Sequence, residues 1–304
     1  MASQRDVKNR IESVRNIRKI TRAMEMVAAA RLRRAEQRIA HLRPYAEAIR
    51  RMTRQAAEAA GGEISGLPIL REHESQDKVA LLLVTADRGL AGAFNSQILR
   101  AGIRAESEHH GEGRSVSFYA SGRRGVSSLT FRGREPAGSW TGFTERPAYA
   151  NARDISSELM AAYVDGHVDR VEILYNGYVS PLVQEVRRET LLPLQHASIL
   201  EDQDGAEGEG EDSSAPTRRA LVEYEPDPSV ILERLVPDYV EISVYRALLE
   251  SSASELGARM TAMRNASENA LQVIDDLTLE MNRARQAEIT QEIMEVVAGA
   301  EALR

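Results

Sequence analysis

The stretch LESSASELGARMTAMRNASENALQVIDDLTLEMNRA, which spans Leu249 to Ala284, decides the fold of this chain. Apolar or small residues recur along it in steps that alternate between four and three positions, at Leu249, Ala253, Leu256, Met260, Met263, Ser267, Ala270, Ile274, Leu277, Met281 and Ala284. A seam with this spacing is typical of a helix that pairs with another helix in a coiled coil. The helical pattern extends from Tyr239 to Arg304, which corresponds to roughly 100 Å of helix. We therefore expect a long C-terminal helix whose partner lies elsewhere in the chain.

The partner helix is predicted at the other end of the chain, in residues 1–60. Residues 1–43 contain neither Gly nor Pro, Pro44 is a candidate kink, and Gly61-Gly62 would end the helix. Its apolar residues also recur in steps of three and four, which predicts an amphipathic helix. The stripe consists of Val7, Ile11, Val14, Ile17, Ile20, Met24 and Val27, followed by Ala28, Leu32, Ala35, Ile39, Leu42, Ala46 and Ile49.

The middle of the chain, residues 78–225, has a different pattern. Short apolar runs bounded by Gly alternate with helical stretches, which is typical of an α/β domain with a largely parallel sheet. Strands are predicted within 78–89, at 113–119, at 171–175 and at 183–192, and helices within 91–110 and 147–166. Residues 220–225 give one more short strand.

Residues 201–217, EDQDGAEGEGEDSSAPT, form an acidic segment with seven acids and no base up to Asp212. Such a segment has too little apolar surface to fold, and we interpret it as a disordered surface loop. A contact with a charged neighbour and an inert loop are both compatible with its composition.

The fold class that follows is α/β. A long antiparallel coiled coil of the N- and C-terminal helices, residues 1–60 and 230–304, accompanies a central Rossmann-like α/β domain, residues 78–225. The coiled coil is the economical arrangement, because each terminal helix has an apolar stripe that must be shielded from water.

Composition narrows the classes of function. The chain has no cysteine, which excludes disulfides, thiolate metal sites and cysteine nucleophiles. No apolar run is long enough for a transmembrane helix.

Residues 1–58 contain 15 Lys/Arg against 6 Asp/Glu, a net charge of +9 in a chain whose total is −7. This basic end fits either a docking surface for an acidic partner or a solvated helix face. Aromatic side chains do not alternate with its basic ones, which disfavours nucleic-acid binding.

The turn from Thr85 to Gly92 is where a phosphate-binding loop would lie, because it follows a strand and opens a helix. It lacks GxGxxG, and it lacks the Lys and hydroxyl of a P-loop, so a tight turn is the preferred interpretation. The six histidines form no HxxxH or HExxH pair, and no nucleophile has an adjacent base. We predict no catalytic, cofactor-binding or metal-binding residues.

The segment from Arg283 to Glu292 is polar on all sides. The seam positions after Ala284 become Glu288 and Gln291, where a coiled coil requires apolar residues. Either the helix leaves its partner here and meets a different surface, or this is an ordinary solvated turn.

These segments resemble the gamma subunit of the F-type ATP synthase, in its bacterial form. SVRNIRKITRAMEMVAA (residues 13–29) is similar to the N-terminal signature of that family, and NRARQAEIT (residues 282–290) with Gln291-Glu292 is similar to its C-terminal signature. Residues 85–95 resemble its first strand-turn-helix, although Ala91 and Ala93 stand where Cys or Ala and Gly are common. The resemblance covers nearly the whole chain. Photosynthetic members carry a redox insert with two cysteines, which this chain lacks.

The resemblance implies a central-stalk rotor subunit, not an enzyme on its own. Its coiled coil would turn inside the catalytic hexamer of alpha and beta subunits, and its base would rest on the membrane c-ring beside epsilon. Transmembrane proton flow would then drive ATP synthesis. The chain would be peripheral at the cytoplasmic face of the cell membrane, bound only through the complex. The residues expected to face the catalytic subunits or to tune coupling are Arg22, Met24, Arg264, Arg285, Gln286, Thr290, Gln291 and Glu292.

Two other hypotheses remain beside the rotor subunit. A nucleotide-using enzyme with an α/β core would bind nucleotide in isolation. A coiled-coil scaffold unrelated to ATP synthesis would purify without alpha and beta subunits.

Overall fold

We describe the protein from a computed structural model, in residues 4–60, 69–71, 73, 75–194 and 227–302. The acidic segment 201–217 and the strand expected at 220–225 lie outside these residues. The chain divides into two compact units. A coil unit consists of residues 1–32, 90–92 and 256–304, and a sheet unit consists of residues 33–89 and 93–255.

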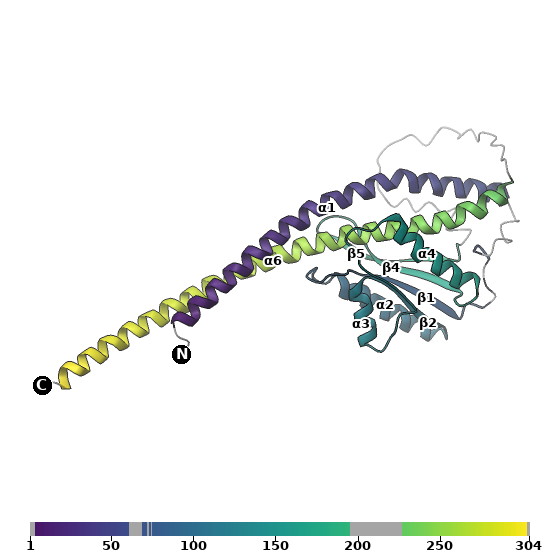
Figure 1. Ribbon diagram of the computed structural model, residues 1–304. Coiled ribbons are helices and arrows are strands. Elements are labelled where there is room, and N and C mark those ends of the chain that lie inside the picture. The colour runs from purple at the N-terminus through teal and green to yellow at the C-terminus, as the bar shows by residue number, and fades with distance from the viewer. Residues whose placement is uncertain (1–3, 61–68, 72, 74, 195–226, 303–304) are drawn as a thin grey trace, which may run out of the picture. The chain divides into compact units, whose positions relative to one another are not determined.

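The sheet unit is built on five strands in the order β3-β2-β1-β4-β5 (Figure 1). Strands β1, β2, β3 and β4 are parallel, and β5 is antiparallel to β4. Their bounds are Lys78–Val84, Ser115–Ser121, Gly138–Trp140, Arg170–Tyr178 and Gln184–Leu192, from β1 to β5. The prediction of a largely parallel sheet is confirmed.

The central strands read as continuous apolar runs because both faces of the sheet are covered. On one face, Leu81 and Leu83 of β1 pack with Ile98 of α2 (Phe94–Gly111) and Leu129 of α3 (Arg123–Phe131). On the other face, alternate strand residues pack against α4 (Tyr149–Val164) and against parts of the two terminal helices. The core of this unit therefore lies in two layers.

Helix α3 and strand β3 were not predicted from the sequence. The helix buries only Gly125 and Leu129, so it carries no apolar stripe for a periodicity argument to detect. Its start depends on Gly122, whose φ of 99° is accessible to glycine. The strand is three residues long and shows no alternation.

Gly102 of α2 allows the helix to lie close to strand β1. A methyl group at this position would lie 2.8 Å from Cδ2 of Leu83, which is fully buried. We expect Gly102→Val to force the helix away from the sheet and to lower the free energy of unfolding by about 1–3 kcal/mol. Urea denaturation measures this, with Gly111→Val as the control, because a side chain at Gly111 meets nothing within 4 Å. Equal losses in the two variants would contradict the packing argument.

The terminal helices are α1 (Gln4–Ala60), with Pro44 inside it, and α6 (Pro228–Ala302), with Pro237 inside it. Helix α6 begins earlier than the pattern starting at Tyr239 indicates. Leu232, Val236 and Val240 are buried at intervals of four, so the apolar stripe continues through Pro237. A proline in the first turn lacks only an N–H that the helix leaves unpaired in any case, which suits Pro228.

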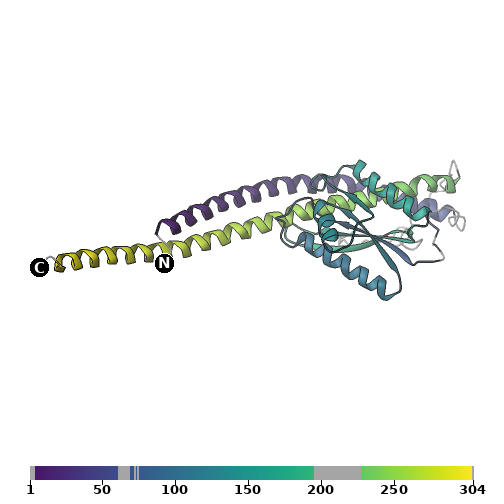
Figure 2. The same ribbon diagram turned by 60° about the horizontal axis from the view of Figure 1, so that its bottom comes forward.

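In the coil unit, α1 and α6 run antiparallel, side by side, as predicted (Figure 2). The buried stripe of α1 differs from the expected one. Ile17, Ile20 and Val27 are at least half exposed, and Thr21, which the pattern did not include, is buried between them; Ala28 and Leu32 are buried as expected. Two successive three-residue steps, from Val14 to Ile20, turn the side chain by about 120° away from the seam at roughly 100° per residue. The expected stripe was therefore wrong at Ile17, Ile20 and Val27, whereas its second run, from Ala28 to Ile49, is buried or partly buried as predicted.

Candidate interaction surface on the coil unit

The end of the coil that contains the start of α1 is held by apolar packing. Val7 and Ile11 of α1 are buried with Ile274 of α6. Val14, Leu277 and Met281 pack around them. The predicted seam positions Ile274, Leu277 and Met281 therefore contact the partner helix.

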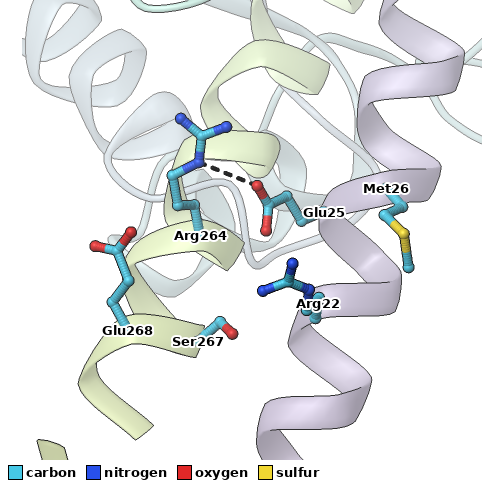
Figure 3. Close-up of a pocket in the computed structure, with 6 residues that line it drawn as sticks. All are labelled: Arg22, Glu25, Met26, Arg264, Ser267 and Glu268. Atoms are coloured by element: carbon cyan, nitrogen blue, oxygen red, sulfur yellow. Dashed lines mark hydrogen bonds and ion pairs between the residues drawn. The ribbon is translucent and has the colours of Figure 1, made fainter. Parts of the chain in front are cut away.

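The middle of the coil is polar. Thr21 of α1 and Ser267 of α6 are both buried at the seam, where a coiled coil normally has large apolar residues. The small side chains leave space, and an open pocket of about 330 Å³ lies here (Figure 3). Its lining residues are Arg22, Glu25, Met26, Arg264, Ser267 and Glu268.

Two guanidinium groups reach this pocket from different helices. Nε of Arg264 donates to Oε1 of Glu25 at 3.0 Å, and the Arg264 side chain is 53% exposed. An ion pair this exposed contributes little to stability, about 0.2–1 kcal/mol. Arg22 is exposed, and within the described residues it makes no ion pair with a carboxylate. A carboxylate from outside the chain could therefore bind Arg22 without breaking an existing pair.

The structure separates the predicted coupling residues into two groups. Arg22 and Arg264 line the pocket, and Met24 is half-buried on α1 beside them. The others are exposed along α6, with Arg285 roughly 30 Å along the helix from Arg264. In this second group Thr290 donates to the carbonyl oxygen of Gln286 at 2.8 Å. Gln291 donates to Glu295 at 2.9 Å. Its members are Arg285, Gln286, Thr290, Gln291 and Glu292.

The end of α6 lies outside the seam. Ala284 is the last residue that is partly covered, and residues 285–299 are all exposed. In Figure 2 this yellow part of the helix continues past the start of α1. The seam therefore stops where the sequence pattern loses its apolar residues, and beyond it the helix has no partner among the residues that the structure describes.

The exposed end carries an apolar stripe that the sequence argument missed. Ile289, Ile293 and Val296 follow each other in steps of four and three, so they share one side of the helix. They are 47%, 57% and 72% exposed, and Met294 and Val297 lie next to them. The spacing is present in the sequence, but the many charged residues between Arg283 and Glu292 led us to interpret this part of the helix as polar on all sides. An apolar stripe of this length on a solvated helix indicates a protein surface that covers it.

The side chain of Asp87 fills the turn after β1. Oδ1 of Asp87 accepts from the backbone N–H of Arg123 at 3.0 Å. Oδ2 accepts from the backbone N–H groups of Gly142, at 2.8 Å, and Thr144, at 3.1 Å. Burial alone raises the pKa of Asp87, but these donors stabilise the carboxylate more and lower the pKa below its ordinary value. The carboxylate thus takes the amide donors that an anion would use, which supports the tight-turn interpretation.

In the described part of the chain, no group of three or more His, Asp or Glu side chains is arranged to hold a metal ion.

Comparison with known proteins identifies the family. Residues 3–303 match the family described as ATP synthase. The ATP synthase gamma chain of Rubrobacter xylanophilus is 44% identical over 303 residues, covering 100% of this chain and 99% of its own length. That of a Nocardioides species is 40% identical over 305 residues, covering 99% of this chain and 96% of its own.

Solved structures agree with this result. A chain of the Tetrahymena thermophila mitochondrial ATP synthase central stalk and c-ring has a TM-score of 0.58 at 25% identity, covering 82% of this chain and 99% of its own. A chain of the Euglena gracilis mitochondrial ATP synthase, at 18% identity, shares the fold with a TM-score of 0.67 over 99% of this chain and 94% of its own. The fold is thus shared with these solved structures, and because the family match spans residues 3–303 and the relatives are 40–44% identical, this chain belongs to the ATP synthase gamma chain family.

Proposed function

We propose that this chain is the central-stalk rotor subunit of an F-type ATP synthase. It couples transmembrane proton flow to ATP synthesis or hydrolysis by rotating inside the catalytic hexamer of alpha and beta subunits. The observation that carries this proposal is the exposed end of α6, which carries an apolar stripe that no other described part of the chain covers. A surrounding ring of subunits would cover such a stripe while leaving the helix free to turn.

The same geometry supports a division of roles along the coil. Apolar contacts have no fixed direction, so a helix with an apolar stripe can turn against an apolar wall without breaking directional bonds. Directional contacts are supplied instead by Arg22 and Arg264 at the pocket. These guanidinium groups bind acidic loops of the beta subunits, and the net charge of +9 in residues 1–58 favours such partners.

The sheet unit supplies the base of the rotor in this proposal. It contacts the epsilon subunit and rests on the c-ring, at the cytoplasmic face of the membrane. Among the described residues, no helix combines the length and the apolar character needed to cross a bilayer. Membrane association is therefore assigned to the complex, and the chain itself is peripheral.

The proposal is tested by reconstitution. Tagged chain is mixed with alpha and beta subunits from the same source, and the complex is completed with epsilon and the membrane sector in vesicles. We expect the chain to co-purify with alpha and beta and to be required for ATP-driven proton pumping. A chain that purifies alone supports the scaffold alternative, and one that binds ATP by itself supports the enzyme alternative.

The exposed end of α6 is tested in the same assay by Ile293→Asp. A charge in the apolar stripe is expected to weaken binding to the alpha–beta hexamer by roughly tenfold, or about 1.4 kcal/mol. Ala298→Asp adds the same charge on another side of the helix and is expected to have a smaller effect. Equal affinities for wild type and Ile293→Asp would show that the stripe does not contribute to the interface.

A further inference from the structure

Strand β5 pairs with β4 in an antiparallel ladder, and its charged side chains form ion pairs on both faces of the sheet. It is one of the two edge strands among those that the structure describes, and only Leu191 and Leu192 at its end are buried. Alternate side chains along a strand point to opposite faces of a sheet. Arg188 points to the α2 face, where it binds Glu172 and Glu108 at 2.6 Å each. Its neighbours Arg187 and Glu189 point to the face that α6 covers.

On that face, four charged side chains and one tyrosine form a joint between the sheet and α6. Nη2 of Arg246 donates to Oε2 of Glu189 at 2.6 Å. Nη1 of Arg187 donates to Oε2 of Glu250 at 3.1 Å. The hydroxyl of Tyr175, on β4, donates to Oε1 of Glu189 at 2.6 Å. We refer to these five residues as the β5–α6 cluster. Its charges balance, and its two shortest ion pairs, Arg246–Glu189 and Arg187–Glu250, join β5 to α6.

Gly177 of β4 provides an independent indication that this geometry is specified. A methyl group at Gly177 would lie 2.6 Å from Cδ of Arg187, too close for contact. The absence of a side chain there lets Arg187 lie across β4 toward α6. A glycine within a strand is otherwise unfavourable, so its position is explained by the space that Arg187 needs.

The cluster is partly removed from water. Tyr175 is fully buried and Glu250 is 8% exposed, whereas the side chains of Glu189, Arg246 and Arg187 are 27%, 29% and 38% exposed. Burial raises the pKa of Glu250, and it raises the pKa of Tyr175 as well. Ion pairs that include a buried partner usually add little net stability compared with apolar residues of similar volume, and their best-attested use is to select one arrangement. Register is therefore the property that the cluster is suited to provide.

Helix α6 needs contacts that fix its register on this face of the sheet. Its apolar residues Val236, Val240, Val244 and Leu248 repeat at nearly every turn. An apolar surface with a repeat of about 5.4 Å packs almost equally well after a shift by one turn. Arg246 and Glu250 meet their partners on β5 in only one register, because a shift would leave the buried carboxylate of Glu250 without Arg187 and Arg246 without Glu189.

We propose that the β5–α6 cluster is a torque joint, which fixes α6 against the sheet so that a turning force on the sheet unit reaches α6 without slip. This inference rests on the proposed rotor function, because only a rotor loads the joint in this way. Arg246 and Glu250 are positioning residues in this scheme.

The experiment replaces the cluster by apolar side chains of similar volume, as Arg187→Met, Glu189→Met, Arg246→Met, Glu250→Met and Tyr175→Phe in one chain. The full complex in vesicles is assayed for ATP hydrolysis without a gradient and for the largest proton gradient it builds. We expect the Tm of the chain and unloaded hydrolysis to stay close to wild type. The largest gradient should fall by about threefold or more, because slip appears only under load.

The matched control removes an ion pair of the sheet unit that does not contact α6. Nη2 of Arg134 lies 2.8 Å from Oε2 of Glu106 on α2, and Arg134→Met with Glu106→Met abolishes this pair. We expect this double variant to build the same gradient as wild type.

A second set of variants decides the question if the apolar cluster does not fold. Glu189→Arg and Arg246→Glu each break the central pair, and together they restore it with reversed charges. We expect both single variants to lower the maximal gradient and the double variant to recover it in part. A full gradient in the apolar variant, or a double variant no better than the singles, overturns the torque joint. Failure of the wild-type chain to support pumping overturns the rotor function instead.

Discussion

Replacing Ile274 by Asp is expected to unfold the coil unit at urea concentrations that leave the wild type intact. Ile274 is 8% exposed and packs against Val7 and Ile11. The substitution removes apolar contacts and places a charge where the adjacent side chains of α1 are apolar. The expected loss in the free energy of unfolding is about 4 kcal/mol or more. Far-UV circular dichroism of the isolated chain during urea titration measures this loss.

The neighbouring residue provides the control. Val273 is 43% exposed, so Val273→Asp adds the same charge at the next position without burying it. We expect this variant to stay within about 0.5 kcal/mol of wild type. In the assembled complex, Ile274→Asp is also expected to uncouple ATP hydrolysis from proton pumping. Full pumping by this variant, or equal destabilisation by both variants, would contradict the assignment of Ile274 to the seam.

Replacing Asp87 by Ala is expected to loosen the sheet unit at the end of β1. The carboxylate accepts from backbone N–H groups that belong to two separate segments, at Arg123 and at Gly142 and Thr144. Removing it leaves these donors without their acceptor and disconnects the start of α3 from the turn that contains Thr144. Bonds to a charged acceptor are strong, and the expected cost is about 3 kcal/mol. Asp154→Ala, on the exposed side of α4, is the control and should be nearly neutral.

The pH dependence follows from the lowered pKa of Asp87. A carboxyl group whose folded pKa lies below its unfolded value stabilises the fold above the unfolded pKa, about 3.9 for Asp. That stabilisation is lost as the pH falls through the folded pKa. The difference in stability between wild type and Asp87→Asn should therefore be largest near neutral pH and should shrink in acid. A difference that stays constant down to the acid transition would show that Asp87 does not act through its charge.

The coil seam was predictable because it is a periodic property of the sequence. The predicted positions from Met263 to Ala284 are at least partly covered, and the cover ends at Ala284, where the pattern indicates. The N-terminal stripe was predicted correctly as far as Val14 and again from Ala28 to Ile49. Between these stretches, Ile17 and Ile20 continue the apolar pattern in the sequence, but their direction on the helix points away from the partner. Hydrophobicity alone does not distinguish a residue that packs inside the chain from one that meets another protein.

Pairings between distant residues were not predictable. Nothing in the local sequence shows that Arg187 meets Glu250 or that Asp87 accepts from Arg123, because these contacts depend on the order and register of the strands. The pocket could be predicted from the sequence only in part. Arg22 and Arg264 were both expected to face other subunits, but only the antiparallel pairing of α1 and α6 places them at one site.

The exposed end of α6 has a consequence for the chain before it is assembled. Residues 285–299 lack tertiary contacts within the described chain, and an isolated helix of this length is only marginally stable in water. The peptide bonds after Arg283 and Arg285 are therefore open to proteolysis in a free subunit and protected in one enclosed by partners. If this end engages the catalytic subunits as proposed, surplus chains would be degraded from this end first, because they lack the partners that would protect it.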